Sequence, residues 1–121
     1  MRANTLRFAT GNAERLRITS SGKMGLGYNS PDTMGTGRLV IGNGSGSETL
    51  TIFSSSTTNG NIHFADGTNN QDRYRGYITY QHSDGVNDNY MAFGTDDVER
   101  LRITSAGKLL LPSNSPGIQF G

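Results

Sequence analysis

The chain has 121 residues and a formal net charge of +1, and only 17% of its residues are charged. This balance excludes the strongly basic surface that nucleic-acid binding requires, and no window approaches the roughly 18 apolar residues of a membrane span. The chain contains no cysteine, which excludes disulfides, thiolate nucleophiles and cysteine-ligated zinc.

The hydrophobic share of the chain is low. Only 32% of residues are hydrophobic, whereas Gly, Ser, Thr and Asn together make up 53 of the 121. Such a composition gives one chain little apolar surface to bury by itself. The apolar residues are nevertheless regularly patterned, so we expect them to be buried against other copies of the chain in an obligate oligomer.

The first predicted strands lie near the N-terminus. Leu16 and Ile18 alternate with charged and polar residues, which is the period of a half-buried strand. We expect this strand to break at Gly22, because glycine adopts positive φ without steric cost. A second short strand is expected at 24–26, and Pro31 forbids its regular continuation.

Further short strands are expected in the middle of the chain, separated by turns rich in glycine or asparagine. The expected strands are 39–42, 49–54, 61–65, 76–82 and 90–95, and the turns between them are 43–47, 55–60, 66–71 and 83–89. The Asp-Gly pairs at 66–67 and 84–85 favour β-hairpins. Since no apolar helical period extends beyond about two turns, the sequence predicts an all-β fold with essentially no helix.

The end of the chain repeats its beginning at an offset of 85 residues. Residues 93–116 align without gaps on residues 8–31, and 15 of the 24 positions are identical. We therefore expect the two copies to follow the same backbone path. The expected parts are fibre repeat copy one at 1–37, an intervening strand region at 38–92 and copy two at 93–121.

Two details of the repeat carry further expectations. Leu110 and Pro112 of copy two stand where copy one has glycine, so we expect a different turn geometry there. Four arginines alternate with the apolar residues, and we expect them on the opposite strand face, with at least one in each copy paired to a carboxylate such as Glu14 or Glu99. These arginines are Arg15, Arg17, Arg100 and Arg102.

The repeated phrase resembles a known family. The stretch ERLRITSSGKMGLG at 14–27, followed by NSP at 29–31, is similar to the repeats of phage and large-virus tail-fibre proteins. The strands at 76–83 and 89–95 also resemble the pair that precedes this phrase in that family. Residues 31–60 resemble no segment of the family.

The resemblance implies an intertwined homotrimeric β fibre segment, located in an extracellular virion tail fibre and joined to other fibre segments. Family members often end in a self-cleaving intramolecular chaperone domain, which this sequence does not contain. Because the repeat begins almost at residue 1 and no closing element follows its second copy, we expect the chain to be a piece of a longer protein.

Two groups of residues are expected to form functional surfaces. The trimer core or the seams between chains are expected to contain Leu16, Ile18, Ile78, Tyr80, Leu101 and Ile103. Aromatic residues are concentrated between Phe64 and Phe93. Tyr74 and Tyr77 are the best candidates among them for an exposed ligand surface, because sugar-binding surfaces use such rings.

The sequence predicts no catalytic site and no cofactor. His82, Ser83 and Asp84 are the residue types of a hydrolase triad, but adjacent strand residues point to opposite faces and cannot form the relay. Asp96 and Asp97 align on the turn residues Gly11 and Asn12 of copy one, which predicts a turn rather than an acid pair.

One metal hypothesis stays open. His63 and His82 are the only histidines. In a trimer, one inward histidine from each chain would form a ring on the axis, a geometry that can bind a transition metal.

The sequence leaves two functions open. The first is a self-associating, non-catalytic structural segment of a viral tail fibre or spike. The alternative is a receptor- or carbohydrate-binding tip domain of such a fibre, which would attach to a host-surface glycan. Aromatic-bearing loops at one end would favour the tip. Neither function is that of an enzyme, and neither requires nucleic acid or membrane insertion.

Overall fold

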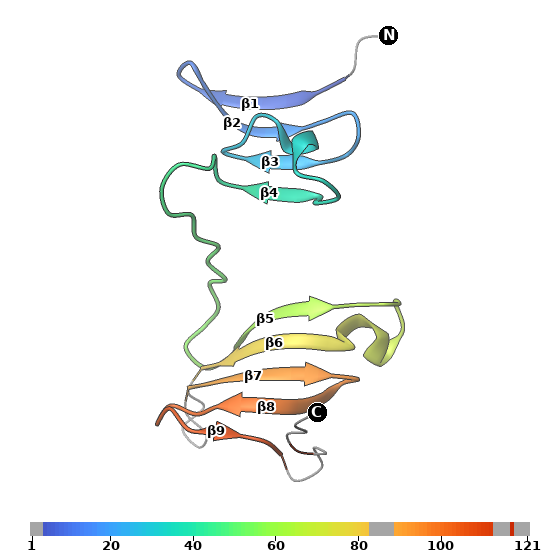
Figure 1. Ribbon diagram of the computed structural model, residues 1–121, viewed down its shortest axis with the longest axis vertical. Helices are drawn as coiled ribbons and strands as arrows, with labels where there is room; N and C mark the ends of the chain where they lie inside the picture. The colour runs from blue at the N-terminus through green and yellow to red at the C-terminus, as the bar shows by residue number, and fades with distance from the viewer. Residues whose placement is uncertain (1–3, 83–88, 113–116, 118–121) are drawn as a thin grey trace. The chain divides into compact units, whose positions relative to one another are not determined.

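The computed structural model describes residues 4–82, 89–112 and 117 (Figure 1). The chain divides into two compact units, Met1–Thr51 and Ile52–Gly121. Each unit contains one β-sheet, and the described residues form no α-helix. The all-β prediction is therefore confirmed. No helix in the described part of the chain is long and apolar enough to cross a membrane.

The first unit contains a sheet of four strands in sequence order. The elements are β1 (Leu6–Thr10), β2 (Ala13–Ile18), β3 (Met24–Leu26), the 3-10 helix η1 (Pro31–Thr33) and β4 (Leu39–Ile41). The strands pair antiparallel except for β3 and β4, which are parallel. A parallel pair needs a crossover connection, and the segment containing η1 supplies it.

The register gives this sheet one apolar and one mixed face. The apolar rows are Leu6, Ile18, Met24 and Leu39, then Phe8, Leu16, Leu26 and Ile41. On the other face, the chain folds back over Gly25, where an added Cβ would lie 2.1 Å from the carbonyl oxygen of Tyr28. Pro31 packs there and is the largest fully buried side chain among the described residues.

The second unit is an antiparallel meander of five strands in sequence order. Its elements are β5 (Asn59–Phe64), the 3-10 helix η2 (Asn70–Tyr74), β6 (Gly76–Gln81), β7 (Tyr90–Thr95), β8 (Val98–Ile103) and β9 (Leu109–Leu110). Figure 1 shows η2 in the connection between β5 and β6.

This sheet also has two different faces. The apolar rows are Ile62, Ile78, Phe93 and Leu101, then Tyr80, Met91, Ile103 and Leu109. The polar rows are Asn61, Thr79, Ala92 and Arg102, then His63, Tyr77, Gly94 and Glu99. The prediction that Ile78 and Tyr80 share one face, and Tyr77 and Thr79 the other, is confirmed.

The two repeat copies form the same hairpin. Pairing of β1 with β2 runs from Leu6 opposite Ile18 to Thr10 opposite Ala13, with a register shift between Phe8 and Ala9. Pairing of β7 with β8 has the same register and the same shift when each number is raised by 85. Gly22 and Gly107 both adopt positive φ, at 77° and 75°. The predicted common path is confirmed as far as β9, and residues 113–116 lie outside the described part.

The copies diverge after the second turn, as expected from Pro112. In copy one, the Gly27 amide donates a hydrogen bond of 2.8 Å to the Arg15 carbonyl, and Leu26 pairs with Leu16. Pro112 occupies the position of Gly27 and has no N–H to donate. Strand β9 therefore ends at Leu110.

Three local features of the structure differ from expectation. No strand forms at 49–54, whose backbone joins neither sheet. A strand forms at Leu6–Thr10, where none was expected, and it pairs with β2. The Asp66-Gly67 pair does not close a two-residue hairpin, because η2 intervenes before β6. The pair at 84–85 lies outside the described residues.

The four repeat arginines were expected on the strand face opposite the apolar residues, and this is wrong for Arg15 and Arg100. The register shift inserts one extra residue into β2 opposite Ala9, and such a bulge reverses the alternation of faces. Glu14 and Arg17 therefore meet on one face although they are three residues apart. Arg15 lies on the apolar face, where its Nε donates a hydrogen bond of 2.8 Å to Thr10 Oγ1. Copy two repeats this arrangement, with Arg100 donating to Thr95.

Candidate functional site

The most distinctive surfaces of the two units are their uncovered apolar sheet faces. Ala92 is the only buried hydrophobic residue among those described. By contrast, Phe8 of the first unit is 52% exposed, and Phe64 and Leu109 of the second are 59% and 70% exposed. Isolated exposed apolar residues are normal, but contiguous apolar faces mark interaction sites.

All residues predicted for the trimer core or seams lie on these apolar faces. Leu16 and Ile18 contribute to the face of the first unit, and Ile78, Tyr80, Leu101 and Ile103 to that of the second. They are half-buried or exposed within one chain. Their predicted contact with other chains stays a prediction.

The polar face of the second unit contains a pocket of about 320 Å³, which we call the tyrosine pocket. Strands β5 to β8, η2 and the β7–β8 turn supply its walls. The lining residues are Asn59, Asn61, His63, Tyr74, Tyr77, Thr79, Tyr90, Ala92, Asp97 and Glu99. Tyr74 and Tyr77, the two residues expected to form a ligand surface, both belong to it.

Tyr77 is positioned by a neighbouring glycine. A Cβ added to Gly94 would lie 2.1 Å from Cε1 of the Tyr77 ring. The ring therefore lies across the β7 backbone at a position where a side chain is missing. Burial raises the pKa of the Tyr77 hydroxyl, and the nearby carboxylates of Glu99 and Asp97 raise it further. The phenol consequently stays protonated and can donate a hydrogen bond.

Tyr90 is held by a cation. The guanidinium carbon of Arg102 lies 3.8 Å from the centroid of the Tyr90 ring. Arg102 also forms two hydrogen bonds with Glu99, of 2.8 and 2.6 Å. The hydrogen bond with Glu99 raises the pKa of Arg102. This chain of contacts fixes both Tyr90 and Glu99 in the wall of the pocket.

Arg75 connects η2 to the turn between β7 and β8. Its guanidinium pairs with Asp96 in that turn, with Asp72 of η2 at 3.4 Å and with Asp66 at 3.6 Å. The backbone carbonyl of Arg75 accepts a hydrogen bond of 3.1 Å from the amide of Asp97. These contacts hold Tyr74 beside the turn that carries Asp97. The predicted turn role of both aspartates is confirmed, with φ of 55° and 59°.

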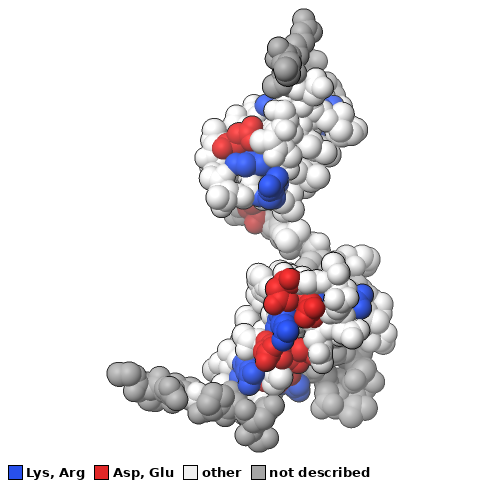
Figure 2. All heavy atoms as spheres, turned by 90° about the vertical axis from the view of Figure 1, so that its right-hand side faces the viewer, with Lys and Arg blue, Asp and Glu red and all other residues white. Residues whose placement is uncertain are grey.

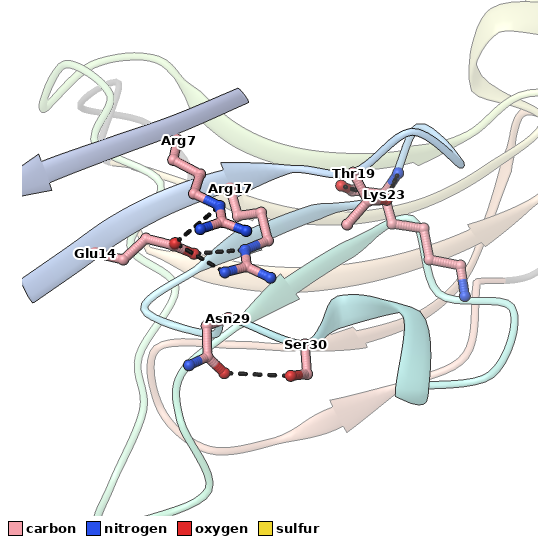
Figure 3. Close-up of polar contacts among 7 residues, drawn as sticks. All are labelled: Arg7, Glu14, Arg17, Thr19, Lys23, Asn29 and Ser30. Atoms are coloured by element: carbon pink, nitrogen blue, oxygen red, sulfur yellow. Dashed lines mark hydrogen bonds and ion pairs between the residues drawn. The ribbon is translucent and has the colours of Figure 1, made fainter. Parts of the chain in front are cut away.

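Copy one carries the matching ion pair. Figure 3 shows Glu14 between Arg7 and Arg17. Arg17 forms two hydrogen bonds with Glu14, of 2.6 and 2.8 Å, and this interaction lowers the pKa of Glu14. The predicted arginine–carboxylate pair is therefore confirmed in both copies. Acidic and basic side chains also lie intermixed on the face drawn in Figure 2.

The two histidines contact different tyrosines. His63 lies on the polar face, where its ring is 5.9 Å from that of Tyr74. His82 follows β6 and packs edge-on against Tyr80, with 5.0 Å between the ring centroids. Ser83 and Asp84 lie outside the described residues. Among the residues that are described, no group of three His, Asp or Glu side chains is placed to hold a metal ion.

Sequence reasoning missed most of the pocket. Asn59 and Asn61 lie at alternate positions of β5, and Tyr77 and Thr79 at alternate positions of β6. This two-residue spacing within each strand was the available signal. Asp97 was assigned only to a turn. No protein-family model matches the chain, and no curated protein sequence matches it.

Proposed function

We propose that the chain is a structural, non-catalytic segment of a trimeric virion tail fibre, in which three copies cover one another's apolar sheet faces. The observation that carries this proposal is the pair of apolar faces left uncovered in a single chain. Among the described residues, no side chain larger than proline is fully buried. A protein with so little core of its own gains its main hydrophobic stabilisation on assembly.

The resemblance of the repeats to tail-fibre proteins supports three copies and gives the extracellular virion setting. In a closed ring of three, each chain forms an interface with both neighbours, whereas each chain of a dimer forms one.

Open strand edges support association between chains. In the first sheet β1 and β4 are the edge strands, and in the second β5 and β9. Edge strands present unpaired backbone groups that natural proteins cover or pair. Neighbouring chains in an intertwined fibre would provide those partners.

The alternative function, a receptor- or carbohydrate-binding tip, concerns the opposite face. It is supported by the tyrosine pocket on the polar face of the second unit. The two functions are compatible, because covering the apolar face leaves the polar face available.

Cysteine cross-linking tests the proposal directly, since the natural chain has no cysteine. Ile103→Cys places one thiol on the apolar face, and Thr79→Cys places one on the polar face of the same sheet, in a strand that has neighbours on both sides. A trifunctional maleimide should link Ile103→Cys into covalent trimers and leave Thr79→Cys monomeric on a denaturing gel. Equal cross-linking of both variants, or none of either, would overturn the proposal.

A further inference from the structure

We propose that the tyrosine pocket binds a neutral, hydroxyl-rich sugar ring. This inference deepens the proposed function and rests on it in one respect: other copies cover the apolar face, so that the polar face is outermost. The pocket volume of about 320 Å³ is at the lower end of the range for small-ligand sites, roughly 300–1,000 Å³. That size suits one or two sugar rings.

The pocket combines aromatic surface with hydrogen-bonding groups. Tyr74, Tyr77 and Tyr90 reach it from η2, β6 and β7. Their rings can pack against the C–H groups of a sugar, which is a largely apolar surface. Gly94 and Arg102 hold two of these rings in place, so less conformational freedom is lost when a ligand binds.

The polar lining is suited to hydroxyl groups. Asn61 Oδ1 accepts a hydrogen bond from the Thr79 hydroxyl, which fixes the orientation of the Asn61 amide. The carboxylates of Asp97 and Glu99 are hydrogen-bond acceptors, and the protonated Tyr77 hydroxyl is a donor. A sugar hydroxyl both donates and accepts, and can therefore use either kind of group.

The charges of the site favour a neutral ligand. Asp97 and Glu99 both line the pocket, so an anionic sugar would meet two carboxylates. A cationic ligand would bind between a carboxylate and an aromatic ring. The Arg102 guanidinium already occupies such a position, because it pairs with Glu99 and lies over the Tyr90 ring. An uncharged ligand avoids the cost of desolvating an unpaired charge.

The repeat provides an internal comparison. Copy one contains the same hairpin and the same ion pair, but Thr5 and Asn12 stand at the positions of Tyr90 and Asp97. Its β1 is an edge strand, so no strands equivalent to β5 and β6 complete a pocket. The tyrosine pocket is therefore an addition to the shared repeat, not a consequence of it.

Saturation-transfer NMR on the full chain tests the inference. The probes are D-glucose, D-galactose and N-acetyl-D-glucosamine, with N-acetylneuraminic acid as the anionic comparison and putrescine as the cationic one. At least one neutral sugar should show saturation transfer and millimolar affinity, and the charged probes should show none. Asp97→Asn should weaken binding about tenfold, which equals about 1.4 kcal/mol, because a neutral amide oxygen accepts a weaker hydrogen bond than a carboxylate. Tyr77→Ala should abolish it.

Matched controls separate the site from the fold. Tyr28→Ala removes a tyrosine of the first unit, outside the pocket, and should bind as the natural chain does. Light scattering on each sample reports assembly independently of binding. A trimer that binds none of the neutral sugars, or binds them equally after Tyr77→Ala, overturns the sugar site alone. Preference for the anionic or cationic probe overturns it as well. A monomeric chain overturns the proposed function instead.

Discussion

The ring of Tyr77 lies over Gly94 so closely that an added Cβ would be 2.1 Å from Cε1. Real Cβ atoms essentially never approach a neighbour this closely, so the two positions are mutually constrained. Copy one has Ala9 at the equivalent position, and β2 is the only strand that pairs with β1 among the described residues. No strand there corresponds to β6, which carries Tyr77. The glycine at 94 therefore belongs to the tyrosine pocket and not to the repeat.

Gly94→Ala should destabilise the second unit by about 2 kcal/mol, because overpacking forces side chains from their preferred rotamers. In a Tyr77→Ala background the same substitution should cost close to nothing. Urea unfolding of the four chains of this double-mutant cycle measures the coupling. An equal cost in both backgrounds would show that the constraint lies elsewhere.

Pro112→Gly should lengthen β9. The amide at position 112 could then donate to the Arg100 carbonyl, as the Gly27 amide donates to Arg15 in copy one. Pairing of Leu111 with Leu101 should follow. Amide hydrogen exchange is the measurement, and the amide at 112 should be protected against exchange. Pro112→Ala is the control, since it restores the N–H but disfavours the positive φ that Gly27 adopts. Fast exchange at 112 in both variants would contradict the explanation.

The Glu14–Arg17 pair predicts a pH dependence. The folded-state pKa of Glu14 is lowered, chiefly by its hydrogen bonds from Arg17. Its contribution to stability is therefore present above the unfolded pKa of about 4.3 and is lost as pH falls through the folded pKa. Carbon-13 NMR titration should give a Glu14 midpoint below that of the Arg17→Gln variant. Identical midpoints would mean that the pair does not persist in solution.

Ile103→Asp tests the role of the apolar face in assembly. A charge placed at a seam between chains would be buried without a partner, which costs about 3 kcal/mol or more. Sedimentation velocity should therefore show a shift toward monomer. Thr79→Asp, on the opposite face of the same sheet and in a central strand, should leave the distribution unchanged. A shift of equal size in both variants would argue against a face-specific effect.

The sequence predicted the fold class and the repeat because two-residue periodicity and turn residues are local signals. Leu16 with Ile18, and Ile78 with Tyr80, were assigned to the correct faces for this reason. The bulge before Leu16 was not predicted, since it arises from pairing with β1. Arg15 was consequently assigned to the wrong face.

The candidate site was only partly predictable. Tyr74 and Tyr77 were expected as an exposed pair from composition and alternation. Asn59 and Tyr90 join them only because β5, β6 and β7 pair in a particular register. Asp97 joins them because Arg75 ties η2 to the β7–β8 turn. Such contacts between distant segments leave no local trace in the sequence.

Light scattering on the full chain tests the central claim most directly. A single chain has a mass of 13.0 kDa, and its apolar faces are uncovered in isolation. We expect a particle of three times that mass that persists on dilution through the micromolar range. A folded, stable monomer at the same concentrations would contradict the fibre assembly and leave the apolar faces without an occupant.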